Sequence, residues 1–111
     1  MTPKDLKWIG SARADIQALP DEAKRQLGYD LRLVQLGQTP RSWRPMPSVG
    51  SGVTEIRVRT EGAFRLMYVA KFADAVFVIH VFQKKSRKTS PLDIELARVR
   101  YASLLRALKE K

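Results

Sequence analysis

The chain has 111 residues, the length of one domain with a single modest core. Its hydrophobic fraction of 44% is that of a folding sequence, and no apolar run of about eighteen residues is present to cross a membrane. There is no cysteine, which excludes disulfides, thiolate zinc sites and a cysteine nucleophile. The start of the chain has no apolar signal-peptide core, so we expect a cytoplasmic protein without a membrane partner.

Charge is the strongest signal in the composition. Twenty-one Lys and Arg residues oppose eleven Asp and Glu residues, which gives a formal net charge of +10. A field of this sign attracts polyanions such as RNA, DNA, anionic lipid or an acidic protein. The basic residues are concentrated in the C-terminal half, where residues 84–88 read K-K-S-R-K. This clustering favours a polyanionic partner over a merely solvated surface.

The first third of the chain predicts a short strand and a pair of helices. Residues 6–9 have strand character, and Ser11 can cap a helix that runs to about Leu19. Pro20 suits the first turn of a second helix, and Gly37 suits its C-terminal cap. Apolar residues at helical spacing give the second helix a buried stripe, which consists of Ala23, Leu27, Leu31 and Val34.

A loop and three strands are predicted next. Residues 38–52 contain three prolines and two glycines, which indicates a loop. Trp43 in this loop is expected to fasten it to the body, with an exposed base-stacking role as the alternative. Apolar and polar residues then alternate over 53–59, 64–72 and 76–83, and short turns separate these segments.

A C-terminal helix completes the predicted fold. Ser90 and Asp93 form an S-x-x-D capping box, with Pro91 at the first helical position. The face predicted to be buried consists of Ile94, Ala97, Tyr101, Leu104, Leu105 and Leu108. The element order is βααβββα, which indicates one α+β domain over residues 1–111, built on an antiparallel sheet with a helical hairpin on one face.

Turn lengths predict the strand register. A three-residue loop in the first hairpin pairs Arg57 with Arg65, and it also places apolar residues opposite apolar ones. A two-residue loop would place apolar residues opposite charged ones. In the second hairpin, a two-residue loop pairs Arg65 with Phe82 and Met67 with His80.

The register sorts the sheet into two faces. The face predicted to pack on the helical hairpin carries Ile56, Val58, Phe64, Leu66, Tyr68, Phe77, Ile79 and Val81. The other face carries Glu55, Arg57, Arg59, Arg65, Met67, His80, Phe82 and Lys84. Directly opposed like charges such as Arg57 and Arg65 are destabilising. A phosphate bound between them is the favoured explanation, and a carboxylate of the protein, such as Glu55, is the structural alternative.

Three segments resemble the RelE/ParE toxin superfamily, and most closely its phage-derived HigB-type branch. These segments are T-E-I-R-V-R (54–59), F-R-L-M-Y-V (64–69) and F-V-I-H-V-F-Q-K-K-S-R-K-T-S-P-L-D-I-E-L-A (77–97). The most specific part is H-x-F-x-K-K, followed by K-T-S-P and an I-E-x-A helix. The resemblance implies the toxin of a type II toxin–antitoxin system, which acts as a ribosome-dependent mRNA endonuclease. The implied partners are the ribosome, mRNA and a cognate antitoxin of helix-turn-helix type.

The resemblance also implies a reaction without metal or other cofactor, in which the 2′-OH of the RNA attacks the adjacent phosphate. Arg65 matches the arginine that grips this phosphate, and Arg57 matches a basic position on the preceding strand. Lys84 stands where RelE has an arginine that acts as acid or charge stabiliser, a departure because lysine is a point charge. Glu55 and His80 complete a Glu–Arg–His set and are the candidate bases. The plainer readings are a salt bridge for Glu55 and a packed strand histidine for His80.

Further side chains are predicted to contact RNA, and these are Arg59, Phe82, Lys85, Arg87 and Lys88. Phe82 either stacks on a base or packs in the core, and the basic run is either a phosphate contact or a solvated surface. No metal-ligand pattern is visible in the sequence. Two alternatives of other classes are open, namely a ParE-like inhibitor of DNA gyrase and a basic binding module without activity.

Overall fold

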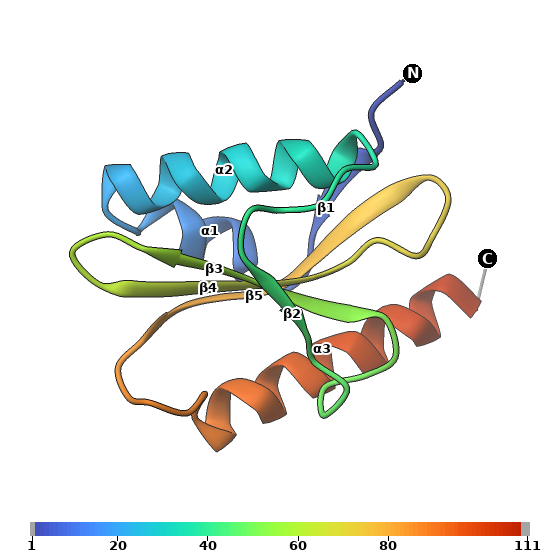
Figure 1. Ribbon diagram of the computed structural model, residues 1–111. Helices are drawn as coiled ribbons and strands as arrows, with labels where there is room; N and C mark the ends of the chain where they lie inside the picture. The colour runs from blue at the N-terminus through green and yellow to red at the C-terminus, as the bar shows by residue number, and fades with distance from the viewer. Residues whose placement is uncertain (1, 110–111) are drawn as a thin grey trace.

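The computed structural model describes residues 2–109, which form three layers (Figure 1). The middle layer is a five-stranded sheet with the order β1-β5-β4-β3-β2. Its strands are β1 (Asp5–Trp8), β2 (Trp43–Pro45), β3 (Val53–Arg59), β4 (Ala63–Val69) and β5 (Ala75–Lys84). The helices are α1 (Ala12–Gln17), α2 (Asp21–Gln35) and α3 (Pro91–Lys109). The first two helices cover one face of the sheet and α3 crosses the other, so the predicted α+β fold is confirmed.

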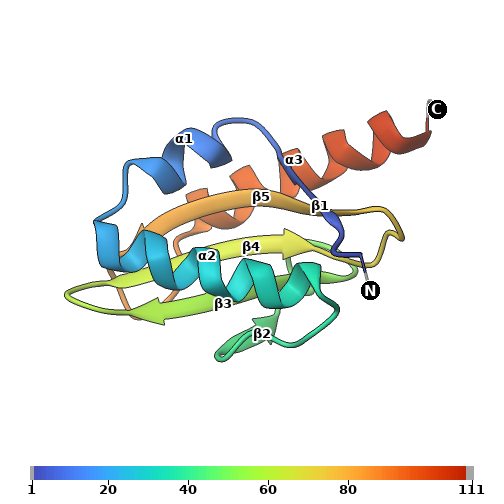
Figure 2. The same ribbon diagram turned by 90° about the horizontal axis from the view of Figure 1, so that it is seen from above.

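The two edges of the sheet each show a feature that was not predicted. The antiparallel arrangement holds for β2 to β5, whereas β1 pairs with β5 in parallel. A parallel neighbour needs a long crossover, and residue alternation alone carries no information about strand direction. At the opposite edge, β2 lies inside the segment that was predicted to be a loop. Figure 2 shows both edges from above, with α1 on the β5 side and α2 on the β3 side.

Helix α2 fits its sequence pattern closely. The predicted stripe is buried, as Ala23, Leu27, Leu31 and Val34 are all in the core beneath it. Gly37 has a φ of 79° and its N–H donates to the carbonyl of Val34, while the N–H of Gln38 donates to Leu33. These two bonds make the predicted glycine cap a Schellman motif. Pro20 precedes the first helical residue by one position rather than occupying it.

A β-bulge in β5 corrects the predicted faces. Met67 pairs with His80, as predicted, but the next residue, Tyr68, pairs with Val78. The register therefore skips Ile79, and the alternation of β5 reverses on the N-terminal side of the bulge. Two residues predicted to face the helical hairpin turn toward α3 instead, and these are Phe77 and Ile79. The prediction was wrong for both because it assumed unbroken alternation.

Helix α3 begins as predicted and covers a second core. The Asp93 N–H donates to the Ser90 hydroxyl at 3.1 Å, which confirms the capping box. Buried residues of α3 are Ala97, Tyr101 and Leu104, with Ile94 and Leu108 partly buried. Leu105 was predicted to be buried but is 39% exposed, because it lies one step of about 100° around the helix from Leu104. Within residues 2–109, no helix combines the length and apolarity needed to cross a bilayer.

Candidate nucleic-acid interface

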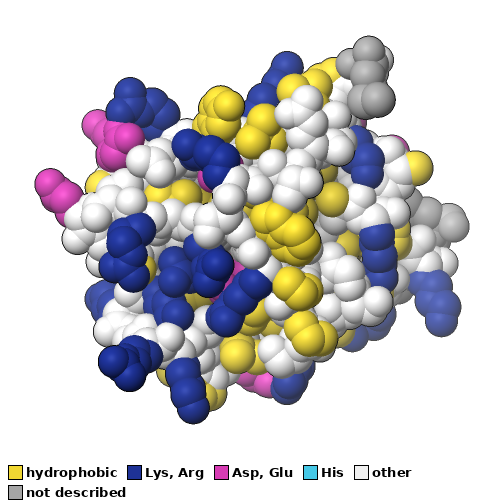
Figure 3. All heavy atoms as spheres, viewed as in Figure 1, with side chains coloured by type: hydrophobic (Ala, Val, Ile, Leu, Met, Phe, Trp, Pro, Cys, Tyr) yellow, Lys and Arg dark blue, Asp and Glu magenta, His cyan; other side chains and the backbone are white. Residues whose placement is uncertain are grey.

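The sheet face that α3 crosses, here called the α3 face, is covered over only part of its length. The β3–β4 turn extends past the start of α3 in both ribbon views (Figures 1 and 2). Five cationic side chains gather at this uncovered end, and we call them the cationic cluster: Arg44, Arg57, Arg59, Arg65 and Lys84. Figure 3 shows Lys and Arg side chains grouped over this end of the molecule.

The strand register assembles the cluster. Arg57 lies directly opposite Arg65, which confirms the predicted register of the first hairpin. Arg65 lies opposite Phe82 and Met67 opposite His80, as predicted, but the two-residue loop assumed for the second hairpin was wrong, because the bulge shifts the register and the strands end at Val69 and begin at Ala75. Arg59 and Lys84 flank Ala63 on its two sides. Four basic side chains from three strands therefore share one small area, together with Arg44 from β2.

Glu55 is the carboxylate within this cluster. It is 0% exposed and lies opposite Arg44, whose Nε donates to the Glu55 Oε1 atom at 3.0 Å. The Arg65 Nε lies 3.6 Å from the same oxygen, which is an ion pair too long to be a hydrogen bond. The predicted structural alternative, a salt bridge for Glu55, is therefore present. Within residues 2–109, neither Arg57 nor Arg59 has an ion-pair partner, so this one carboxylate leaves most of the cluster's charge uncompensated.

Two buried polar atoms in the cluster lack a hydrogen-bond partner among residues 2–109. They are the Glu55 Oε2 atom and the Arg65 Nε atom. Arg65 is only 7% exposed, and its Nη1 donates to the carbonyl of Phe64. Buried polar groups are normally satisfied, and leaving one unpaired costs about 1–3 kcal/mol. Unpaired buried polar atoms are uncommon in folded proteins, so this pair at the centre of a cationic surface calls for an explanation.

The charges of the cluster act on one another's proton affinity. Burial lowers the pKa of Arg65, an effect that Glu55 opposes and that Arg57 and Arg44 strengthen. Arginine nonetheless stays protonated at neutral pH. Burial and the positive charges of Arg65 and Arg44 lower the pKa of Lys84. A lysine with a lowered pKa gives up its proton more readily, which makes the Lys84 ammonium a better proton donor than a free lysine.

His80 lies on the same face but beneath α3. It is 4% exposed, and its Nε2 is 2.7 Å from the Asp93 Oδ1 atom on α3. Arg100 approaches the other ring nitrogen at 3.5 Å. The ring also stacks on Phe82, with centroids 4.7 Å apart, and Phe82 is buried. Of the predicted Glu–Arg–His set, Glu55 and Arg65 are in contact, whereas His80 contacts α3. Phe82 packs in the core, as the second of its two predicted readings had it.

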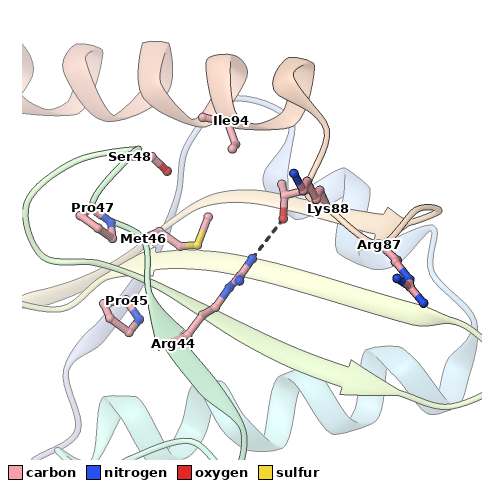
Figure 4. Close-up of a pocket in the computed structure, with 9 residues that line it drawn as sticks. Arg44, Pro45, Met46, Pro47, Ser48, Arg87, Lys88 and Ile94 are labelled. Carbon is pink, nitrogen blue, oxygen red and sulfur yellow. Dashed lines mark hydrogen bonds between the residues drawn. The ribbon is translucent and has the colours of Figure 1, made fainter.

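The predicted RNA-contacting run lies beside the cluster, where it shares hollows with Lys84 and Arg44. Lys85, Arg87 and Lys88 are exposed in the connection between β5 and α3. Three hollows are each lined in part by residues of the cluster. One is lined by Ser42, Arg57, Val58, Arg59 and Arg65 and has a volume of about 270 Å³. A second, of about 200 Å³, is lined by Gln83, Lys84, Lys85, Ser86, Lys88, Ser90 and Asp93. The third, of about 390 Å³, is lined by Arg44, Pro45, Met46, Pro47, Ser48, Arg87, Lys88, Thr89 and Ile94 (Figure 4).

Sequence reasoning missed Arg44, which links the cluster to the third hollow. Its Nη2 donates to the Thr89 hydroxyl at 3.4 Å, drawn as a dashed line in Figure 4. The available signal was Pro45, because proline is tolerated in edge strands such as β2. Trp43 in the same strand is 44% exposed, so it fastens the segment less completely than predicted. No group of three or more His, Cys, Asp and Glu side chains within residues 2–109 is arranged to hold a metal ion.

Comparison with protein families identifies a match over most of the chain. Residues 14–102 match the family described as Phage derived protein Gp49-like (DUF891). The matched range includes the whole cationic cluster and every residue that lines the three hollows. No curated protein matches the chain.

Proposed function

The chain belongs to the Gp49-like family of phage-derived proteins, a family of RelE-like toxins, and on that premise we propose that it cleaves mRNA on the ribosome as the toxin of a type II toxin–antitoxin pair. The observation that carries the proposal is the uncovered cationic cluster, in which Arg57 directly opposes Arg65. Opposed like charges are destabilising in a sheet, and a bound phosphate would offset that cost.

The proposed reaction uses the RNA's own nucleophile. The 2′-oxygen loses its proton and bonds to the adjacent phosphorus, while the bond from phosphorus to the 5′-oxygen breaks. The products are a 2′,3′-cyclic phosphate and a 5′-hydroxyl, and no external water or cofactor is consumed. The protein must orient the phosphate, stabilise the added negative charge and supply a proton to the leaving oxygen.

The cluster contains groups suited to stabilise the added negative charge and to supply the proton. Arg57 and Arg65 come from neighbouring strands and can bind the non-bridging phosphate oxygens from two sides. Lys84 flanks the same area from β5 and has a lowered pKa, so its ammonium is suited to protonate the leaving 5′-oxygen. Arg59 and the exposed run Lys85, Arg87 and Lys88 would then hold the phosphates on either side of the cut.

Glu55 is the better placed of the two candidate bases. Its Oε2 atom is an unused acceptor beside the phosphate-binding arginines, and because Glu55 is fully buried, proton removal requires a rearrangement around it. His80 is separated from the cluster by its stacking on Phe82 and by its contact with Asp93. We therefore assign proton removal to Glu55 and assign to His80 the role of fixing the start of α3.

The proposed partner is an antitoxin that presents Asp or Glu residues to the cationic cluster or its rim. Complementary charge makes such capture fast, and salt screens it. The association rate should therefore fall steeply as the salt concentration rises. A rate that does not respond to salt would contradict this placement of the antitoxin.

The proposal is tested by inducing the protein alone and mapping RNA 5′ ends on matched translated and untranslated messages. In-frame cuts confined to the translated message are expected. Arg57→Ala should reduce the cuts, whereas Arg32→Ala, which removes an exposed arginine from α2 on the opposite face, should not. Intact RNA together with DNA-damage signalling would favour gyrase inhibition instead.

A further inference from the structure

The third hollow lies between two segments that are far apart in sequence. One wall is β2 and the residues after it, and the other is the β5–α3 connection with the first turns of α3 (Figure 4). Its volume of about 390 Å³ is within the range of small-ligand sites. The lining is mixed: Met46 and Ile94 belong to the apolar core beneath α3, while Arg44 and Lys88 are cationic.

The walls of this hollow are held in place by side chains outside it. The Arg98 Nε on α3 donates to the Ser48 carbonyl at 2.9 Å. Tyr101 donates its hydroxyl to the Ser51 carbonyl, and its ring packs so closely on Gly50 that a Cβ there would lie 2.2 Å from the ring. These contacts fasten the β2–β3 connection to α3. The hollow is therefore preformed, which lowers the entropic cost of binding a ligand.

The hollow is also continuous with the cationic cluster. Arg44 lines the hollow and donates to Glu55, and Glu55 in turn pairs with Arg65. A phosphate at Arg57 and Arg65 would thus be connected to the hollow through Glu55 and Arg44. A flat aromatic ring attached to that phosphate through its ribose would meet an apolar floor and the guanidinium of Arg44, and proteins use arginine guanidinium planes to stack unstacked nucleobases.

We propose that this hollow, here called the base pocket, holds one nucleobase of the RNA next to the phosphate bound at the cationic cluster. The inference rests on the proposed function and deepens it, because the base pocket would determine which nucleotide lies beside the cut. Met46 and Ile94 supply the contact with the base, and Arg44 joins base binding to phosphate binding. The chemistry that fits is an RNA nucleotide with its base splayed out of the strand.

The test measures binding to RNA that cannot be cleaved. The probes are a fluorescent trinucleotide with 2′-O-methyl riboses and three versions of it, each abasic at one position. The wild-type protein should bind the intact probe about fivefold or more tightly than one of the abasic versions, as expected for a base that stacks on the Arg44 guanidinium. Ser48→Trp fills the base pocket from an exposed position and should bring this ratio close to one, while salt-dependent binding of the abasic RNA persists.

The matched control is Ser103→Trp, which adds the same side chain at an exposed position of α3 outside the base pocket and should leave the ratio unchanged. A ratio of one at all three positions in the wild type, or an unchanged ratio in Ser48→Trp, would overturn the inference. The first of these results is also expected if the hollow receives an acidic protein segment instead. The probes cannot react, so binding and cleavage are tested separately. A wild-type protein that cleaves mRNA but binds the intact and abasic probes equally refutes the base pocket alone. Base-dependent binding without mRNA cleavage refutes the proposed function alone.

Discussion

The two ends of the α3 face differ in the side chains that they carry and in whether a helix covers them. At one end, Met67 and Ile79 are covered by α3 and form an apolar core with it. At the other end, Arg57 and Arg65 oppose each other, and no helix covers them. The strands are the same three in both places, so the difference lies in which side chains the register aligns. One end is built for packing and the other tolerates a like-charge pair.

A protein can maintain such a cationic end only if the rest of the fold stabilises it. Like charges opposed in a sheet and buried unpaired polar atoms both subtract from stability. Conflicts of this kind between local rules and the fold are expected at functional sites. The covered end supplies the compensating burial, and α3 is fixed in place there by Asp93, which contacts His80, and by Arg98, which donates to the Ser48 carbonyl.

The largest effect is expected from Glu55→Gln, which keeps the shape of the side chain but removes the charge and the proton acceptor. If Glu55 is the base, the single-turnover cleavage rate on programmed ribosomes should fall about 10²–10⁴-fold. The same change leaves Arg65 without its buried counter-charge, so we also expect a loss of about 3–5 kcal/mol in unfolding free energy. Rates must therefore be measured where circular dichroism shows a folded variant. A folded Glu55→Gln protein that cleaves at the wild-type rate would show that Glu55 is not the base.

Arg65→Ala should lower the cleavage rate about a hundredfold and abolish toxicity, because it removes a donor that stabilises charge in the transition state. Since Arg65 is buried, Arg65→Lys is the companion variant that keeps the charge while losing the planar fork. We expect Arg65→Lys to retain the fold and recover only part of the rate. Full toxicity of a well-expressed Arg65→Ala protein is incompatible with the proposed site.

His80→Ala probes the covered end and should affect stability more than chemistry. It removes the contact with Asp93 and the stacking on Phe82, so the thermal midpoint should fall. The cleavage rate of the folded variant should change far less than in Glu55→Gln. Asp93→Asn, which weakens the same contact from the α3 side, is expected to reproduce the His80→Ala result. If His80→Ala alone lowers the rate by 10² or more, then His80 and not Glu55 is the base.

The smallest effects are expected in the pH dependence that Lys84 confers, which for the cleavage rate is measured without removing the proton donor. The proton donor is lost as the pH rises through the lowered pKa of Lys84, so the cleavage rate should decline at a lower pH than it would with an ordinary lysine. Lys84→Arg should move this decline to higher pH. Because the unfolded chain binds this proton more tightly, stability should rise slightly with pH between the lowered value and 10.5. The slope should disappear in Lys84→Met, and an unchanged slope would contradict the proposed coupling within the cluster.

Most of the fold could be predicted because local rules and tertiary structure agree there. The stripe of α2, the glycine cap at Gly37 and the capping box at Ser90 each depend on residues close together in sequence. Turn lengths likewise fixed the pairing of Arg57 with Arg65. The bulge at Ile79 could not be predicted, since nothing in an apolar run shows where its alternation breaks.

The site could be predicted only in part. The hairpin register was sufficient to place Arg57 and Arg65 together, but the covering helix was needed to separate His80 from them. Arg44 was missed because it lies in a strand of three residues within a proline-rich segment. Its contacts with Glu55 and Thr89 join segments far apart in sequence, and such contacts leave no periodic signal.

The most direct test of the central claim, that the cationic end cleaves RNA through the substrate's own 2′-OH, is the chemistry of the cut. Ribosomes are programmed with an mRNA that has either a ribose or a 2′-deoxyribose at the mapped cut site, and the 3′ ends of the products are analysed. The account predicts a 2′,3′-cyclic phosphate from the ribose message and no cleavage at the deoxy position. A 3′-hydroxyl product, or normal cleavage of the 2′-deoxy message, would contradict it.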